Sequence, residues 1–280
     1  MRRRGSSLVE PGFAERFAAE GWLRVGGLFD RKLIDEVHEE CERQLESLTE
    51  LHGGHRAYIN VGDKRMMLPI RLTGAVANPK LYANPLLLAM LRQLLGNDFL
   101  IDNFTCVVAL PGAQDQRPHE DHPDLFPEVA DLRTELPPYA ITVAIPLVDL
   151  TEETGTTRIF AGSNRLVGEP VEELPYLRRG DCYLMDYRTE HRGTANRSER
   201  SRPVLFVIYS RYWFTDIRNF RRQARINIEM EEARKIPAEY HFLFRRLAGK
   251  GTFAVSQKEI FPEIPDLLQP SPAAANPPRD

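Results

Sequence analysis

The stretch YAITVAIPLVDLTEETGTTRIF (139–160) decides the fold class. It contains two runs rich in β-branched and aromatic residues, 139–150 and 156–160. The turn-like EETGTTR (152–158) leads from the first run into the second. Similar runs occur at 104–112, 181–187 and 203–214, with Gly, Pro, Asn and Asp between them. Short strands at this spacing predict an antiparallel sandwich or jelly roll, in a protein that is mainly β with flanking helices.

Helical patterns precede the β region. Phe13, Phe17 and Trp22 have a helix-like spacing that breaks at Gly26-Gly27, and a second apolar face follows Asp30, which stands where a helix N-cap is expected. The apolar run 85–96 predicts a third helix that stops at its final glycine.

The whole chain, 1–280, predicts a single domain, because a mixed barrel of this length commonly folds as one unit. The expected parts are an amino-terminal helical segment (about 12–96), a jelly-roll core (about 100–215), a carboxyl-terminal helical segment (216–250) and a proline-rich flexible tail (about 265–280).

The composition excludes several classes of protein. The net charge of -3 gives no basic field for nucleic acid, and no apolar run reaches the length of a membrane span or signal peptide. Cys41, Cys106 and Cys182 are far apart, which disfavours a disulfide framework. Cys106 and Cys182 lie in apolar strand-like runs, which predicts small buried side chains. We expect a soluble cytoplasmic protein without nucleic-acid or membrane partners, and a homodimer stays open.

The segment RPHEDHPD (117–124) carries a metal-binding pattern. On extended backbone, His119 and Asp121 point to the same side, whereas Glu120 and His122 point to the other. His191 supplies a third ligand from the turn between two later strands. Two imidazoles and one carboxylate are the protein ligands of non-heme Fe(II) sites that activate dioxygen.

A 2-oxo acid bound at such a site needs a cation for its distal carboxylate. A guanidinium binds a carboxylate through two parallel hydrogen bonds. Arg202 borders the apolar run PVLFVIY and is the arginine we expect to be buried, while Arg192, Arg197 and Arg200 are its competitors.

These residues together resemble the phytanoyl-CoA dioxygenase family of Fe(II)/2-oxoglutarate oxygenases. That family has an HxD pair, a distal histidine in H-x-G-x-x-N-x-S and an arginine about eleven residues later, here His119 and Asp121, then His191, Gly193, Asn196, Ser198 and Arg202. The resemblance runs from about 13 to 215 and implies a double-stranded β-helix (cupin-like). It also implies Fe(II), 2-oxoglutarate and dioxygen as cofactor and co-substrates, and oxidation of an unactivated carbon.

The resemblance also suggests contacts with 2-oxoglutarate and shows departures from the family pattern. Gln116 resembles a glutamine that touches the co-substrate, with Gln114 as its competitor, and Thr142 either faces the co-substrate or packs. Gly193 stands where some relatives carry a hydroxyl residue, so Thr194 supplies that contact or it is absent. The usual GSH is GSN here, which leaves Asn164 without an imidazole.

Two other classes of function stay open. A zinc hydrolase would use His119, His122 and His191 with Glu120 as base, although Pro118 and Pro123 disfavour the helix that such a set needs. A non-catalytic jelly-roll binding protein is the third class.

We expect a small-molecule substrate from specialised metabolism. Hydroxylation, desaturation and cyclisation are all open outcomes. The residues that either line its pocket or lie on surface loops are Tyr58, Arg65, Met67, Arg71, Arg211 and Trp213.

Overall fold

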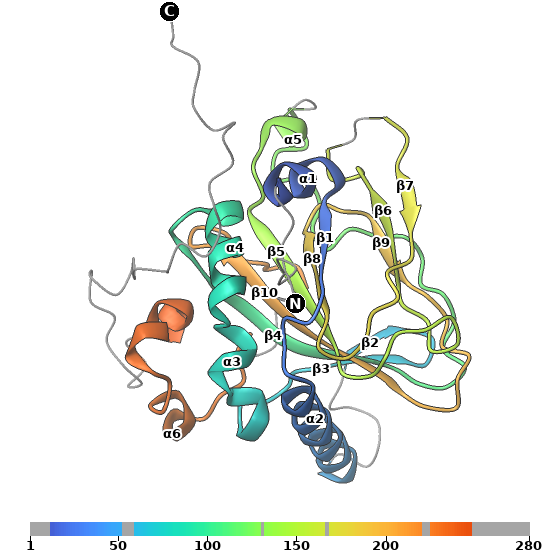
Figure 1. The fold of residues 1–280 in the computed structure, drawn as a ribbon, viewed down its shortest axis with the longest axis vertical. Coiled ribbons are helices and arrows are strands. Elements are labelled where there is room, and N and C mark those ends of the chain that lie inside the picture. Colours follow the sequence, from blue (N-terminus) through green and yellow to red (C-terminus); the bar gives the residue numbers. More distant parts are fainter. Residues whose placement is uncertain (1–11, 52–58, 130–131, 166–167, 220–224, 248–280) are drawn as a thin grey trace, which may run out of the picture.

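The computed structural model describes residues 12–51, 59–129, 132–165, 168–219 and 225–247. Two antiparallel sheets form its β part: a seven-stranded sheet in the order β1-β8-β5-β10-β4-β3-β2, and a three-stranded sheet in the order β7-β6-β9 (Figure 1). The strands are β1 (Trp22–Val25), β2 (Ile59–Gly62), β3 (Arg65–Leu68), β4 (Phe99–Ala109), β5 (Ala140–Pro146), β6 (Thr157–Ala161), β7 (Val171–Glu173), β8 (Cys182–Asp186), β9 (His191–Gly193) and β10 (Arg202–Arg211). The predicted mainly β jelly roll is confirmed.

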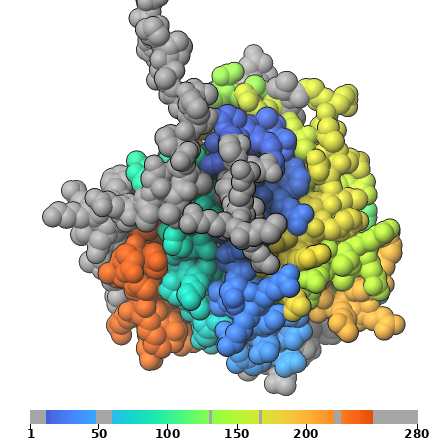
Figure 2. All heavy atoms as spheres, viewed as in Figure 1, coloured from blue at the N-terminus to red at the C-terminus, as the bar shows by residue number. Residues whose placement is uncertain are grey.

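Helices cover the outer face of the larger sheet. The helices are α1 (Phe13–Glu20), α2 (Arg31–Leu51), α3 (Pro79–Tyr82), α4 (Pro85–Leu95), α6 (Met230–Ala233), the 3-10 helices η1 (Gly74–Ala77) and η2 (Ala238–Leu247), and α5 (Leu132–Glu135), which lies beside the HxD segment instead. Figure 2 shows the segment from α1 to α2 in blue, between the yellow strands and the teal helices α3 and α4. Local signals set two of the helix starts: the side chains of Asp30 and Asn84 accept hydrogen bonds from the first-turn amides of α2 and α4.

Strand alternation separates a core from a cavity. In β10, Leu205, Val207 and Tyr209 join the core under the helices, whereas Val204, Phe206 and Ile208 line a cavity between the sheets. The two longest strands, β4 and β10, pair along ten positions and form the floor of this cavity. Each of these two strands therefore presents one row of side chains to whatever binds in the cavity.

Several local expectations were wrong. The first helix ends at Gly21, whose φ of 77° is left-handed, and Trp22 lies in β1, paired with Met185. Arg65 and Met67, for which a surface loop was one of two expectations, lie in the β2–β3 hairpin, and this hairpin extends the larger sheet. After residue 216, the described residues form only the short α6 and η2 rather than a long helix.

The predicted burial of Cys106 and Cys182 is confirmed. All three cysteines are buried and unpaired. Within the described ranges, no helix has both the length and the apolar character needed to cross a membrane.

Candidate active site

A backbone pair joins the two predicted histidine ligands. The His119 amide donates to the His191 carbonyl at 2.9 Å, and the His191 amide donates to the His119 carbonyl at 2.9 Å. His119 thus forms an antiparallel bridge on the free side of β9, whose other side pairs with β6. Because directly opposed residues share a face of a sheet, the two imidazole rings lie 4.5 Å apart.

Asp121 completes a group that can hold a metal ion. One nitrogen of each histidine and one oxygen of Asp121 all lie within 4.8 Å of one another, and His191 Nε2 is 3.8 Å from Asp121 Oδ1. The Nδ1 atoms are occupied elsewhere, because that of His119 donates to the Arg117 carbonyl and that of His191 to the Thr189 carbonyl. Each Nε2 therefore keeps its lone pair for a ligand.

The surroundings favour the metal-binding forms of these groups. Burial lowers the pKa of His191, against the opposing effect of the Asp121 carboxylate, so the neutral imidazole dominates at neutral pH. The Thr142 hydroxyl donates to Asp121 Oδ2 at 3.1 Å, and the Asn219 amide donates to the Asp121 carbonyl at 2.7 Å. This donor set of two imidazoles and one carboxylate fits Fe(II) with open coordination positions.

Glu120 and His122 point away from this group, as expected for extended backbone. The carboxylate of Glu120 binds the guanidinium of Arg133 at 2.8 Å. His122 donates from Nδ1 to the Pro123 carbonyl, and its ring packs edge-on against Phe214 at 5.2 Å. The structure therefore does not bring together the ligands and base that the zinc-hydrolase alternative requires.

The group formed by His119, Asp121 and His191 opens onto a cavity of about 670 Å³. Arg202 lines it and is 4% exposed. Burial lowers the pKa of Arg202 to about 10, and the charge of Arg65 acts in the same direction, yet the guanidinium stays charged at neutral pH. Its competitors Arg192, Arg197 and Arg200 do not line the cavity.

A sequence model of the phytanoyl-CoA dioxygenase family matches residues 17–204. The chain belongs to the phytanoyl-CoA dioxygenase family. This family consists of non-heme iron, 2-oxoglutarate-dependent oxygenases, which use Fe(II), 2-oxoglutarate and dioxygen as cofactor and co-substrates.

Named relatives and solved structures agree with this membership. The chain is 29% identical to dioxygenase af480 of Aspergillus fumigatus over 53% of its length, a match that spans about half (49%) of that relative. It is 22% identical to dioxygenase aneA of Aspergillus aculeatus over 71% of each protein. The fold is similar to that of the 2-oxoglutarate-dependent epimerase SnoN, with a TM-score of 0.56 and 21% identity over 71% of this chain and 80% of SnoN.

This phytanoyl-CoA dioxygenase family member has a second buried guanidinium in the cavity. Arg65 is 4% exposed, and its Nη2 donates to the carbonyls of Gln114 and Thr194. Its Nε is buried and has no hydrogen-bond partner among the described residues. A Cβ on Gly193 would lie 2.7 Å from Arg65 Nη1, so Arg65 occupies the space beside the glycine.

Of the other residues expected to contact the co-substrate, Gln116 lines the cavity, whereas Gln114, Thr142 and Thr194 do not. Gln116 lines the cavity, accepting from the Gly193 amide and donating to the Val61 carbonyl, whereas Gln114 is exposed. Thr142 is absent from the cavity wall and contacts Asp121 instead. The hydroxyl of Thr194 donates to the Thr156 carbonyl and also stays outside the wall, so it does not supply the missing family contact.

The expected substrate residues also divide. Arg65 and Met67 line the cavity of this family member. Arg71 pairs with Glu229, Arg211 donates to the Pro138 carbonyl and Trp213 is 64% exposed, so none of these three lines it. Tyr58 lies outside the described residues.

Sequence reasoning missed a row of cavity residues on β8 and the turn after it. Tyr183, Met185 and Tyr187 all line the cavity, and the hydroxyl of Tyr183 lies 2.8 Å from that of Thr157. The signal was present in DCYLMDY, where alternate positions carry these side chains. Asn219 also lines the cavity, and no local pattern marks it.

Proposed function

We propose that the protein is an Fe(II)/2-oxoglutarate-dependent dioxygenase that oxidises an unactivated C–H bond of a small molecule, with His119, Asp121 and His191 as the metal ligands. The observation that carries this proposal is the convergence of their ligand atoms within 4.8 Å, on the wall of a cavity that also holds Arg202. Bound Fe(II) would supply oxygen activation coupled to decarboxylation of 2-oxoglutarate.

We assign the distal carboxylate of 2-oxoglutarate to Arg202. Among the described residues, Arg202 donates to one acceptor, the Thr154 carbonyl at 2.9 Å, which leaves several of its N–H groups for a ligand. Arg65 adds a second positive charge close enough to lower the pKa of Arg202. Two buried cations repel each other, and an anion between them relieves that repulsion. Arg65 and Arg202 together therefore favour a dianionic co-substrate.

Gln116 and Thr142 take different parts in this proposal. Gln116 bridges β2 and β9 through its amide and shapes the wall beside the co-substrate. Thr142 orients Asp121, because its hydroxyl holds Oδ2 and leaves Oδ1 on the side of His191.

The rest of the cavity suits an organic substrate. Its wall is largely apolar: Val61, Met67, Val107, Leu150, Met185, Val204, Phe206 and Ile208. Structures of similar fold have been solved with nogalamycin RO in SnoN and with hygromycin B in HygX of Streptomyces hygroscopicus. We propose a small molecule of specialised metabolism as substrate and a cytoplasmic enzyme; hydroxylation, desaturation and cyclisation are the candidate outcomes.

An anaerobic titration tests the proposed function. Fe(II) and 2-oxoglutarate together should give a visible metal-to-ligand charge-transfer band, and His119→Ala and Arg202→Ala should abolish it. His122→Gln is the matched control, because His122 is a neighbouring histidine that faces away, and it should keep the band. A band that survives His119→Ala, or tight zinc that depends on His122, would contradict the ligand assignment. Failure to form succinate with any substrate would favour a binding protein.

A further inference from the structure

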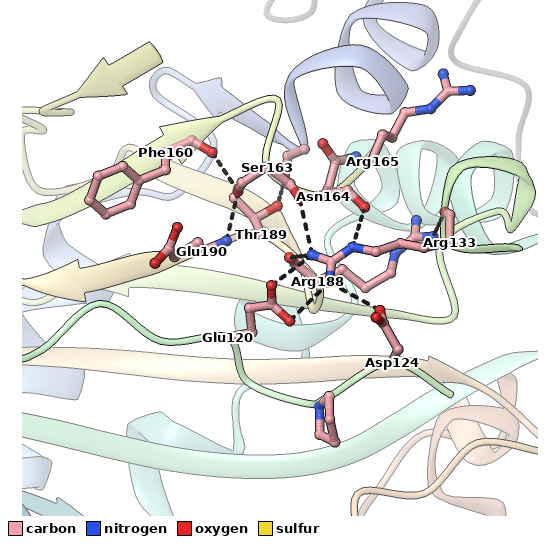
Figure 3. A network of polar contacts seen from close by, with 12 residues as sticks. Glu120, Asp124, Arg133, Phe160, Ser163, Asn164, Arg165, Arg188, Thr189 and Glu190 are labelled. Atoms are coloured by element: carbon pink, nitrogen blue, oxygen red, sulfur yellow. Dashed lines mark hydrogen bonds and ion pairs between the residues drawn. The ribbon is translucent and has the colours of Figure 1, made fainter. Parts of the chain in front are cut away.

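Arg133 is a buried arginine between the HxD segment and β5. It lies on α5, is 6% exposed and makes six hydrogen-bond contacts with its five N–H groups, because the two N–H groups of Nη2 share three acceptors. Two go to the Glu120 carboxylate in a bidentate pair at 2.8 and 3.2 Å, and one goes to Asp124 at 3.0 Å (Figure 3). Both acceptors belong to the segment that carries His119 and Asp121.

The other three hydrogen-bond contacts reach the loop after β6 and the turn that precedes His191. Arg133 donates to the carbonyls of Arg188, Ser163 and Asn164 at 2.6, 3.0 and 3.1 Å. Arg188 returns the contact by donating to the Arg133 carbonyl at 3.0 Å, and its guanidinium is fixed on Asp186. Figure 3 shows Arg133 between the two carboxylates and these carbonyls. Each arginine side chain therefore hydrogen-bonds the backbone carbonyl of the other arginine and holds it in place.

This network ends directly beside the metal-ligand candidates. Glu120 stands between His119 and Asp121, so on extended backbone a fixed Glu120 side chain directs both neighbours to the other side. Ser163 accepts a hydrogen bond from the Glu190 amide at 2.8 Å, one residue before His191. The Arg188 carbonyl is one residue before that of Thr189, which accepts from His191 Nδ1.

Only a guanidinium can make these contacts. Burial alone would lower the pKa of Arg133, but its bonds to Glu120 and Asp124 raise the pKa overall, so the group stays charged. The planar fork has five N–H groups on three nitrogens, whereas a lysine has one nitrogen with three N–H groups. A lysine at this position would keep the charge but could not hydrogen-bond the two carboxylates and the three carbonyls at the same time.

We propose that Arg133 is a positioning residue, which holds the HxD segment and the His191 turn in the relative placement that a metal ion requires. Glu120, at the middle position of the HxD pattern, supplies the carboxylate that Arg133 holds, so in this chain another residue type at this position would lose the contact. The inference rests on the proposed ligand set of His119, Asp121 and His191.

The test compares two arginines that are buried to a similar degree. Arg245 has a side chain that is 8% exposed, pairs with Asp98 and donates to the carbonyls of Phe99 and Phe242, away from the cavity. Arg133→Lys, Glu120→Gln and the control Arg245→Lys are titrated with Co(II) in metal-free form, and their melting temperatures are measured. Glu120→Gln is the milder variant and decides the matter if Arg133→Lys does not fold.

We expect Arg133→Lys to raise the Co(II) Kd by about tenfold or more, the range found when groups that orient metal ligands are changed. Glu120→Gln should raise it by a smaller factor. Arg245→Lys should lower the melting temperature and leave the Kd unchanged. The inference is overturned if both site variants bind Co(II) like the wild type, or if Arg245→Lys weakens binding equally. A wild-type protein that binds no Co(II) would instead refute the ligand set itself.

Discussion

Replacing Gly193 with alanine should destabilise the protein through contact with the cavity arginine. Gly193 has no left-handed φ, so its backbone accepts alanine, and the substitution alone would stabilise by about 0.4–1 kcal/mol. The new Cβ, however, would lie 2.6 Å from Gln116 Oε1 and 2.7 Å from Arg65 Nη1, well inside the 3.4 Å at which ordinary contact begins. Both atoms are side-chain ends, but hydrogen bonds hold Arg65 and Gln116 in place and would be lost if they moved aside. Such overpacking costs about 1–3 kcal/mol, so the steric cost wins.

The net loss of roughly 1–2 kcal/mol lowers the melting temperature by about 2–8 °C at the usual ratio for a chain of this size. Thermal unfolding of the metal-free protein measures it. Arg65→Ala removes one of the two clashes, so the Arg65→Ala/Gly193→Ala double variant should lose less than the sum of the single variants. Gly26→Ala is the control, because the nearest atom to its Cβ is 3.8 Å away. Additive losses, or a Gly193→Ala protein that melts like the wild type, would refute the reasoning.

Three further outcomes are expected. Thr142→Val removes the donor to Asp121 Oδ2 and should raise the Co(II) Kd by about tenfold, whereas Thr142→Ser should bind like the wild type; equal affinities of the two variants would contradict this. Arg202→Lys should raise the KM for 2-oxoglutarate by roughly 10- to 100-fold, because a bidentate, charge-assisted contact worth about 1.5–3 kcal/mol is lost; an unchanged KM would exclude Arg202. Burial lowers the pKa of His191, so as the pH falls the unfolded chain protonates its imidazole before the folded protein does. The free energy of unfolding of the metal-free protein should therefore decrease as the pH drops below about 6.5. Urea unfolding at pH 7.5 and 5.5 measures this decrease, which should be smaller in His191→Gln.

The long strands and the metal-ligand candidates could be predicted because their signals are local. Strands β4, β5, β6, β8 and β10 each contain a continuous β-branched or aromatic run. The orientation of His119 and Asp121 follows from two-residue alternation between prolines. The metal role of these residues stays a prediction, although the structure brings them together.

The short strands and the wall of the cavity depend on distant contacts. Strands β7 and β9 have three residues each, too few to show a period, and β9 exists because His191 pairs with Ile159 and His119. Gly193 resembles an ordinary turn glycine in the sequence, yet its role is to make room for a side chain from β3. No pattern within one segment can report such a contact.

The carboxyl-terminal segment shows how tertiary contacts override a helical pattern. The sequence predicted a helical segment over 216–250, but Arg225 binds the buried carboxylate of Asp102 on β4 and donates to the Asp216 carbonyl. A side chain drawn to a buried charge sets the path of the backbone, and the described part of this segment forms only short helices.

The mutual backbone hydrogen bonds of His119 and His191 have a consequence for the order of folding. Strands β5 to β8 lie between these two residues in the chain, so their pairing closes a long loop and is favoured only after the intervening strands have assembled. A metal ion therefore binds only after the barrel has folded and does not nucleate its folding. Refolding rates should be the same with and without the ion, whose effect belongs to the rate of unfolding.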